Sequence, residues 1–535
     1  MPATLLARDL SLSYGDHVVL SSVSITIAPR ARIGIVGPNG TGKTSLLRTI
    51  AGLQVADAGS IAIAPPTATV GYLPQEPERR AGETVRAFLA RRTGVAAATD
   101  ELHQATTTVE DEPDRYSAAL DRWLALGGPD LDARIGPLWA ELGLPPPLLD
   151  QDMTTLSGGQ AARSSLAAIL LAQFDVFLLD EPTNDLDFDG LDRLERFVAS
   201  LDGGLAVVSH DRAFLERTIT SVLELDEHQH TARLYDGGWL AYLDERATAR
   251  RHAEEAFGEY REKKRSLEER ARSQRQWAVQ GVKKEKKNPR DNDKAQRDWR
   301  LNRTEKLAGK VKITEKALDR LDVVEKPWEG WQLNLEIAAA PRSGEVVARL
   351  SEAIVERGAF ALGPIDLEVG WAERIAILGP NGSGKTTLLA ALLGRLPLAS
   401  GTQWIGPGVI VGEIDQARAR FEGHESTLVA FMAESGLTQQ QAARSLLAKF
   451  GIGPDHIARP ADSLSPGERT RAVLALLMAR GVNCLVLDEP TNHLDLPAIE
   501  QLEQALETYD GTLLLVTHDR RLLDAVKIDR TVELG

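Results

Sequence analysis

Two stretches of the chain have the composition and spacing of a phosphate-binding loop. One is GPNGTGKT at residues 37–44, and the other is GPNGSGKT at residues 379–386. Each follows an apolar, strand-like run and precedes a helical Leu-Leu pattern, which is the context that makes this motif specific. Glycines allow backbone N–H groups to wrap phosphate oxygens. The sequence therefore predicts two sites for ATP and Mg²⁺ rather than two chance matches.

We expect a contiguous set of loop residues to contact the nucleotide in each copy. Lys43 and Lys385 are predicted to reach the β- and γ-phosphates, and Thr44 and Thr386 to offer hydroxyls to Mg²⁺. The first set is Gly37, Pro38, Asn39, Gly40, Thr41, Gly42, Lys43, Thr44 and Ser45. The second set is Gly379, Pro380, Asn381, Gly382, Ser383, Gly384, Lys385, Thr386 and Thr387.

Each copy also has an apolar, strand-like run that ends in Asp-Glu. Asp180 and Asp488 are predicted to hold Mg²⁺, directly or through water. Glu181 and Glu489 are predicted to orient or deprotonate the attacking water, since phosphoryl transfer depends on positioning and charge neutralisation. The alternative is a pair of strand-end carboxylates that cap the next turn, but both copies repeat the arrangement.

Two further residue types repeat beside these motifs. His210 and His518 each follow an apolar strand and precede Asp-Arg, which favours a γ-phosphate contact over an ordinary structural histidine. Gln75 and Gln416 end short extended runs and are predicted to contact Mg²⁺ or the attacking water. Ordinary loop glutamines are the alternative for this second pair.

The motif spacing shows where the two copies differ. Lys43 and Lys385 are 342 residues apart, whereas Glu181 and Glu489 are only 308 apart. The first copy therefore carries an insertion, which we place within residues 94–144 and expect to be a helical arm. The resulting organisation is a first ATPase domain at 1–243, a linker at 244–326 and a second ATPase domain at 327–535.

The sequence of the linker predicts a hairpin of two helices. Helical patterns cover residues 242–282 and 294–322, and the Asn-Pro and dense charge of residues 283–293 predict a turn between them. The linker has a net charge of +8, although the whole chain has a net charge of −15. A concentrated basic segment on an acidic protein indicates a local polyanion contact.

Basic and aromatic residues gather near the predicted turn. Basic groups neutralise phosphates and aromatic rings can stack on bases, so we expect RNA binding there. The alternative is a solvated charged hairpin whose two tryptophans pack against each other. The candidate RNA-binding residues are Trp277, Lys283, Lys284, Lys286, Lys287, Arg290, Lys294, Arg297 and Arg300.

Composition sets the class of protein. Hydrophobic residues make up 43 % and charged residues 26 % of the chain, as in globular proteins. No apolar run reaches the roughly 20 residues needed to span a bilayer, and the N-terminus does not resemble a signal peptide. We therefore expect a cytoplasmic protein without a membrane partner. The single cysteine, Cys484, excludes an intramolecular disulfide.

Together these motifs resemble the ATP-binding-cassette superfamily, because LSGGQ at residues 156–160 and LSPGE at residues 464–468 match its signature motif. The resemblance implies an α/β fold of two ATPase domains, with mixed sheets and helical subdomains, joined by the long helical linker. It also implies that each signature faces the γ-phosphate of the opposite half, and that Tyr14 stacks on adenine. The signature residues concerned are Ser157, Gly158, Gly159, Gln160, Ser465, Pro466, Gly467 and Glu468.

The second copy departs from the family pattern in two places. Pro466 and Glu468 replace a glycine and a glutamine of the signature, while its serine and second glycine remain. Counting back to the loop places Glu356 where the first copy has Tyr14. Adenine stacking in the second site would then be weaker or use another group, such as Arg357.

The whole-chain layout resembles the ABC-F family, which has two cassettes, no membrane part and a charged linker, and EPTNHLD at residues 489–495 adds to the likeness. The resemblance implies a monomer whose halves pair around ATP and Mg²⁺ and which then binds the ribosome from the tRNA exit site. The linker would contact ribosomal RNA or P-site tRNA near the peptidyl-transferase centre, and hydrolysis would release the protein. Such a protein is a translation factor or protects the ribosome from antibiotics.

Two other functions remain open from the sequence. One is the ATP-binding motor of a drug exporter of macrolide type, working with a separate membrane protein. The other is an ATPase that remodels DNA. The linker is too charged to lie in lipid, which argues against the exporter.

Overall fold

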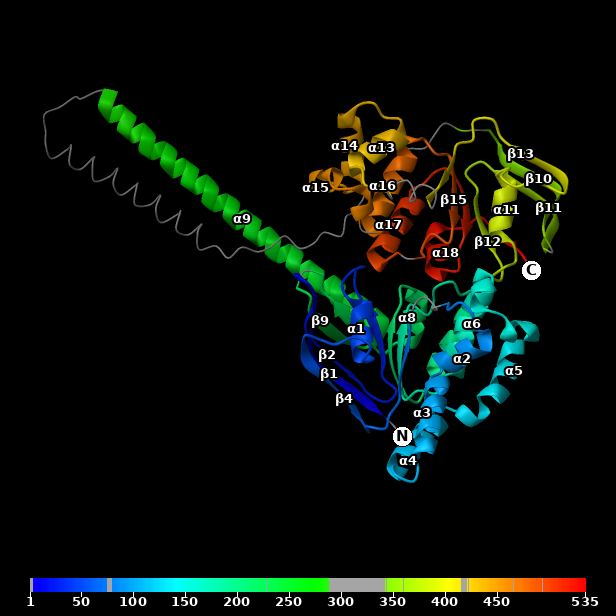
Figure 1. The fold of residues 1–535 in the computed structure, drawn as a ribbon. Coiled ribbons are helices and arrows are strands. Elements are labelled where there is room, and N and C mark those ends of the chain that lie inside the picture. Colours follow the sequence, from blue (N-terminus) through cyan, green and yellow to red (C-terminus); the bar gives the residue numbers. More distant parts are fainter. Residues whose placement is uncertain are drawn as a thin grey trace, which may run out of the picture. The chain divides into compact units, whose positions relative to one another are not determined.

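The computed structural model describes residues 3–74, 79–227, 229–287, 342, 344–358, 360–414, 421, 423–464, 466–492 and 494–535. It divides into two compact units. The first unit comprises Met1–Tyr242 with Leu333–Gly535 and contains both copies of the repeated motifs, and the second unit is Leu243–Gln332. Each copy in the first unit is an α/β half, which confirms the predicted fold class (Figure 1).

The first half is organised around a six-stranded sheet whose order is β5-β6-β7-β3-β8-β9. The central strands β3, β6 and β7 are buried at every residue, as expected for parallel strands covered on both faces. The strands are β3 (Arg32–Val36), β5 (Val70–Leu73), β6 (Val176–Asp180), β7 (Gly204–Val208), β8 (Ser221–Leu225) and β9 (Ala232–Asp236).

A second, antiparallel sheet of order β2-β1-β4 completes the core of this half. Its strands β1 (Thr4–Tyr14) and β2 (His17–Ile27) form a hairpin through Gly15, whose φ of 60° suits a two-residue turn. Strand β4 is Ala58–Ala64. Alternate residues of β1 and β2 pack with β3 and α1 (Lys43–Ile50) in one hydrophobic cluster.

The remaining helices of the first half lie between β5 and β8 in the sequence. The stretch expected to hold an inserted arm, residues 94–144, contains three helices, and the Trp123 indole of one donates to the Thr99 hydroxyl of another at 3.0 Å. The helices are α2 (Val85–Arg92), α3 (Val95–Thr107), α4 (Pro113–Ala125), α5 (Leu131–Glu141), α6 (Gly158–Leu171), α7 (Phe188–Ser200) and α8 (Arg212–Thr218).

The second half repeats this plan. Its larger sheet has the order β14-β15-β16-β12-β17 and its smaller sheet has the order β11-β10-β13. The strands are β10 (Val346–Arg357), β11 (Phe360–Gly370), β12 (Arg374–Leu378), β13 (Ser400–Ile405), β14 (Val411–Glu413), β15 (Cys484–Asp488), β16 (Thr512–Val516) and β17 (Arg530–Glu533). The helices are α11 (Lys385–Leu392), α13 (Thr427–Ser435), α14 (Gln440–Lys449), α15 (Pro454–Ala458), α16 (Pro466–Ala479), α17 (Leu496–Glu507) and α18 (Arg520–Val526).

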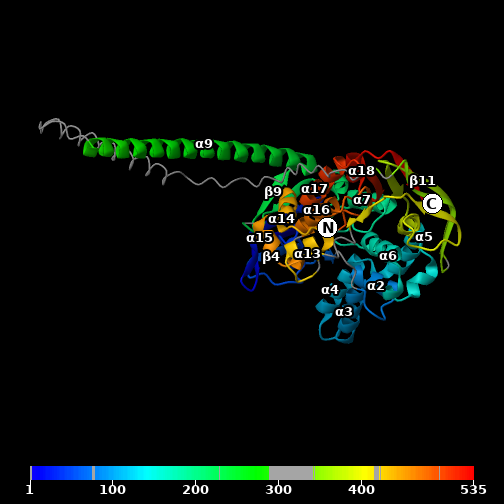
Figure 2. The ribbon, with the colours of Figure 1, turned by 90° about the horizontal axis from the view of Figure 1, so that it is seen from above.

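Helix α9 (Gly238–Lys287) has 50 residues, and its part from Leu243 onwards belongs to the second unit (Figures 1 and 2). At about 1.5 Å per residue it spans roughly 75 Å. The turn predicted from residue 283 was wrong for its first five residues, which are helical, because Lys and Glu favour helix and the first proline comes only at position 289. The second predicted linker helix, at 294–322, lies outside the described residues. Among the described helices, none is long and apolar enough to cross a bilayer.

One arginine in each half ties the central sheet to the helix beyond the Asp-Glu strand. Arg32, 7 % exposed at the start of β3, donates from its guanidinium to the carbonyls of Val198, Leu201 and Gly203. Arg374 at the start of β12 likewise donates to the Tyr509 carbonyl at 2.7 Å. A planar fork with five donors can satisfy several carbonyls at once, which a lysine cannot do.

We predict that Arg32→Ala destabilises the protein by about 3 kcal/mol, because it leaves buried carbonyls without donors. Thermal unfolding of the full chain should show a fall in the unfolding midpoint of roughly 6–12 °C. Arg30→Ala is the matched control, since the Arg30–Asp202 pair is 77 % and 87 % exposed. Such an exposed pair contributes at most about 1 kcal/mol. Equal shifts in the two variants would contradict this account of Arg32.

Candidate active site

The first phosphate-binding loop connects β3 to α1 and depends on its glycines. Gly37, Gly40 and Gly42 have φ values of 155°, 89° and 93°. A Cβ atom on Gly42 would lie 2.5 Å from the Val19 side chain, so no larger residue fits there. The backbone N–H groups at the start of α1 form a helix N-terminus, which suits an anion.

The loop lysines are buried and fold back onto their own loops. Lys43 Nζ donates to the carbonyls of Gly37 at 2.7 Å and Pro38 at 3.0 Å. Lys385 Nζ donates to the Gly379 carbonyl at 2.8 Å, so the two loops have the same geometry. Burial lowers the pKa of both lysines, and nearby carboxylates oppose that shift. An ammonium held in this way could exchange carbonyl oxygens for phosphate oxygens.

The Asp-Glu strands bring carboxylates beside these loops, in positions suited to a cation. Asp180 is 2 % exposed, and its Oδ1 atom has no hydrogen-bond partner within the described residues. Its Oδ2 atom accepts from the Tyr72 hydroxyl at 3.1 Å. In the second half the Thr386 hydroxyl donates to Asp488 Oδ2 at 2.7 Å. Hydroxyl and carboxylate oxygens are ligands that Mg²⁺ prefers, so these residues fit that ion.

Glu181 and Glu489 have the properties of a general base. Burial raises the pKa of each carboxyl to about 7, although Lys43 and Lys385 oppose that shift. A carboxylate with a pKa near neutrality can accept a proton from water at physiological pH. Both residues have a positive φ, 49° and 46°, which is uncommon for glutamate and is typical of functional positions.

A histidine lies against each of these glutamates. His210 Nε2 is 3.1 Å from Glu181 Oε1, and His518 Nε2 is 3.4 Å from Glu489 Oε1. Each histidine also directs its backbone N–H to the other glutamate oxygen at 3.3 Å. Burial lowers the pKa of His210 to about 3 and of His518 to about 4. Both imidazoles are therefore neutral and could donate one N–H to a phosphate.

The first signature motif begins helix α6 and lies close to the second loop. Ser157 and Gln160 form a reciprocal capping box, with distances of 3.3 and 3.0 Å. A Cβ atom on Gly159 would lie 3.2 Å from the Asn381 side chain of the other half. Gly158 and Gly159 line a cavity of about 400 Å³ together with Glu489, so the structure brings these parts of the two halves together.

Part of the second signature is described. Glu468 in α16 lies 3.0 Å from both His456 Nε2 and Arg459 Nη2, so its charge is paired with cationic or titratable groups of its own half. Pro466 and Gly467 are described only as the first residues of α16. The other sequence-predicted residues Gln75, Gln416 and Ser465 lie outside the described residues.

Reciprocal hydrogen bonds join each loop to the opposite half. The Asn381 backbone N–H donates to Asp187 Oδ2 at 2.9 Å, and the Asn39 backbone N–H donates to Asp495 Oδ2 at 3.0 Å. The other oxygen of each aspartate caps its own helix, by accepting from the N–H of Gly190 or of Ala498. The sequence did not predict either contact, although each aspartate is the last residue of the repeated EPTNxLD motif.

The position that matches Tyr14 in the second half is Arg357, so the sequence-based choice of Glu356 was wrong. Tyr14 ends β1 and pairs with His17, and Arg357 ends β10 and pairs with Phe360 in the same way. The connection from β2 to β3 is one residue longer than that from β11 to β12, which shifted the count. Arg357 and Phe360 line the pocket at the second loop, so Phe360 is a further candidate for adenine contact.

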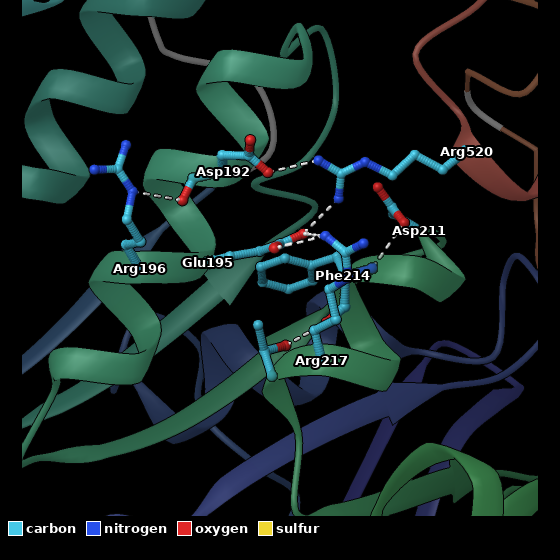
Figure 3. Close-up of polar contacts among 8 residues, drawn as sticks. Asp192, Glu195, Arg196, Asp211, Phe214, Arg217 and Arg520 are labelled. Carbon is cyan, nitrogen blue, oxygen red and sulfur yellow. Dashed lines mark hydrogen bonds and ion pairs between the residues drawn. The ribbon is translucent and has the colours of Figure 1, made fainter.

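Ion pairs between the halves surround the candidate sites. Arg212 follows the first histidine motif and binds Glu503, with one contact of 3.0 Å. The matching Arg520, 308 residues later, contacts Glu195 at 2.9 Å and Asp192 at 2.6 Å (Figure 3). The start of α8 thus contacts α17, and the start of α18 contacts α7. Each of these arginines lies two residues after the histidine of its own half. The ion pairs therefore hold each histidine near a helix of the other half, which is α17 for His210 and α7 for His518.

Comparison with known proteins agrees with this architecture. A family model described as ABC transporter matches residues 20–184 and 362–492. The energy-dependent translational throttle protein EttA of Mycobacterium tuberculosis is 34 % identical over 96 % of this chain and 88 % of its own length. The tylosin resistance ATP-binding protein TlrC of Streptomyces fradiae is 35 % identical, over 95 % of this chain and 93 % of its own.

Solved structures share the fold at lower identity. An archaeal ribosome recycling factor, aABCE1, in complex with the ribosomal stalk protein aP1, superposes with a TM-score of 0.57. It is 21 % identical, and the match covers 98 % of this chain and 87 % of that chain. A structure named RNase-L Inhibitor has a TM-score of 0.56, 21 % identity and the same coverage.

Two α/β halves, each with a phosphate-binding loop, an Asp-Glu strand and a signature helix, define a tandem ATP-binding-cassette ATPase. The family model matches both halves, so the chain binds ATP and hydrolyses it. Relatives at least 30 % identical align over nearly the whole length of this chain, including a protein named ABC transporter F family member 5 of Arabidopsis thaliana. The chain belongs to the ABC-F family.

Asp211 allows a prediction about pH. It caps α8 by accepting from the Phe214 N–H at 2.9 Å (Figure 3), and burial raises its pKa to about 6, with Asp519 of the other half adding to the shift. The folded protein therefore holds a proton between about pH 4 and pH 6 that the unfolded chain releases. Stability contributed by this protonated carboxyl is lost as the pH rises through that window.

We predict that Asp211→Asn stabilises the protein at pH 7.5, because asparagine keeps the cap and cannot become charged. The unfolding midpoint should rise by about 2–4 °C at pH 7.5, and the gain should shrink as the pH falls towards 5. Thermal unfolding at both pH values checks this. A gain that is the same at both pH values would show that the buried charge is not its cause.

Proposed function

We propose that this chain is a ribosome-associated ATPase that closes on two ATP molecules with Mg²⁺, binds the ribosome in that state and leaves it after hydrolysis. The observation that carries the proposal is the alignment with a translational throttle protein over 96 % of this chain, which extends across both ATPase halves and the linker. The similar alignment with a tylosin resistance protein supports a role either in translation or in antibiotic protection of the ribosome.

Each site would be composed from both halves. Lys43, Asp180 and Glu181 would act with Ser465 and Gly467 at the first site. The second site would combine Lys385, Asp488, Glu489, Ser157 and Gly159. Support for this pairing comes from the cavity shared by Gly158, Gly159 and Glu489, and from the loop-to-aspartate hydrogen bonds.

The chain's own residues would then drive hydrolysis. The loop lysines bind the β- and γ-phosphates, and Thr44 with Asp180, or Thr386 with Asp488, would hold Mg²⁺. Mg²⁺ bound there supplies charge neutralisation for the phosphates. Glu181 and Glu489 would take the proton of the attacking water, and the neutral histidines would donate an N–H to the γ-phosphate. Gln75 and Gln416 remain proposed contacts of the ion or of the water.

The linker would contact ribosomal RNA and P-site tRNA, and its proposed limits are residues 244–326, between domains at 1–243 and 327–535. Helix α9 contains Trp277, Lys283, Lys284, Lys286 and Lys287 near its described end. A continuous helix of 50 residues, roughly 75 Å long, supports a linker that can contact an extended RNA surface. The remaining proposed contacts, Arg290, Lys294, Arg297 and Arg300, lie outside the described residues.

Trapping the ATP state tests the proposal. In the double variant Glu181→Gln and Glu489→Gln, ATP remains bound because the attacking water is not activated, so the protein should co-sediment with ribosomes in a sucrose gradient. The control adds Lys43→Ala and Lys385→Ala, which should prevent ATP binding and ribosome association. Sedimentation with membranes would instead support the exporter motor, and absence from both fractions would contradict the proposal.

The linker prediction uses charge reversal. Changing Lys283, Lys284, Lys286 and Lys287 to Glu should weaken ribosome binding by at least about tenfold, because phosphate contacts are lost, with ATP affinity unchanged. The matched control reverses four exposed residues earlier in α9, and its effect should be smaller: Arg261, Lys263, Lys264 and Arg265. An equal loss of ribosome binding in both variants, or a parallel loss of ATP affinity, would argue against a specific role for the four lysines.

A further inference from the structure

His518, the histidine of the second site, is buried but is not oriented by hydrogen bonds from its ring. It is 7 % exposed, and neither ring nitrogen has a hydrogen-bond partner among the described residues. Glu489 Oε1 lies 3.4 Å from Nε2, without hydrogen-bonding geometry. An imidazole without directional polar contacts can rotate about its side-chain bonds unless neighbouring atoms restrict it.

An aromatic side chain of the other half packs against this ring. Phe188, the first residue of α7, places its ring 5.2 Å from the His518 ring, centroid to centroid, at an interplanar angle of 82°. Perpendicular aromatic pairs at this separation are attractive and directional. Phe188 follows Asp187 in the chain, and Asp187 is itself fixed by its hydrogen bond to the Asn381 N–H at 2.9 Å.

The same phenyl ring also contacts Arg520. The Arg520 guanidinium carbon lies 5.6 Å from the Phe188 ring centroid, within cation–π range. Arg520 is held in turn by Asp192 at 2.6 Å and Glu195 at 2.9 Å, both in α7 (Figure 3). The position of Phe188 is therefore determined by α7, by Asp187 and by an anchored arginine.

Among the described residues, the first site has no matching aromatic contact. The residue 308 positions after Phe188 is Leu496, the first residue of α17, and it has no ring to stack on His210. His210 Nε2 lies 3.1 Å from Glu181 Oε1, but that oxygen has no hydrogen-bond partner among the described residues, so the shorter distance is not a hydrogen bond. The ion pairs of Arg212 and Arg520 repeat in both halves, whereas the residue beside the histidine differs.

We propose that Phe188 is a positioning residue for His518, so that hydrolysis at the second site depends on an aromatic contact from the first half that the first site lacks. The inference rests on the proposed part of His518 in hydrolysis. Phe188 does not touch the nucleotide in this account; it holds the imidazole where its N–H can meet the γ-phosphate. The competing explanation is that Phe188 only fills space between the halves.

The test measures phosphate release from the full chain with one site silenced. In a Glu181→Gln background only the second site keeps its general base, and Phe188→Leu should lower kcat about tenfold there. Phe188→Tyr keeps the ring and should restore kcat to within about twofold of that background. Affinity for a fluorescent ATP analogue should stay within about twofold, which shows that the fold and the loop are intact.

Two comparisons distinguish a Phe188 that positions His518 from a Phe188 that only fills space between the halves. In a Glu489→Gln background only the first site acts, and Phe188→Leu should leave kcat unchanged. In the Glu181→Gln background, Phe188→Leu combined with His518→Ala should be no slower than His518→Ala alone, because the ring acts through the histidine. The inference would be overturned if the losses of kcat caused by Phe188→Leu and His518→Ala multiplied in the combined variant. It would also be overturned if Phe188→Leu lowered kcat equally in the Glu181→Gln and Glu489→Gln backgrounds.

The same experiment also tests the proposed role of His518 in hydrolysis, separately from the role of Phe188. If His518→Ala leaves kcat unchanged in the Glu181→Gln background, the histidine has no part in hydrolysis, and both the proposed mechanism and the inference drawn from it are wrong. If His518→Ala lowers kcat but Phe188→Leu does not, only the inference about Phe188 is wrong.

Discussion

Two carboxylates, Asp187 and Asp495, each join a helix of one half to the phosphate-binding loop of the other, and both candidate sites depend on this contact. One oxygen caps α7 or α17, and the second accepts the backbone N–H of Asn381 or Asn39. A carboxylate has a fixed shape, so both hydrogen bonds form only when the halves are in register. The same register brings Gly159 against the second loop.

Burial also sets the electrostatics of the sites. Burial raises the pKa of Glu181 and Glu489 to about 7 and keeps His210 and His518 neutral, so each site has a proton acceptor and an uncharged donor at physiological pH. Removing water strengthens every charge interaction near the phosphates.

The two sites are built on one plan but differ in detail. In the first, the Tyr72 hydroxyl donates to Asp180, whereas the matching position in the second is Glu413, which pairs with Arg395. At the expected base-binding position Tyr14 is replaced by Arg357. These differences alter groups around the phosphates and the base while leaving the loops themselves alike.

The sequence by itself determined the loops, the Asp-Glu strands, the α/β class and the family, because these features depend on residues that are neighbours along the chain. Only the tertiary structure decided the partners across the halves, such as Asp187 with Asn381, which are 194 residues apart. It also decided that Arg357 rather than Glu356 matches Tyr14, because a connection one residue shorter shifts the count but not the strand pairing. Such contacts depend on how two folded surfaces meet, so they cannot be predicted from patterns among residues that are neighbours along the chain.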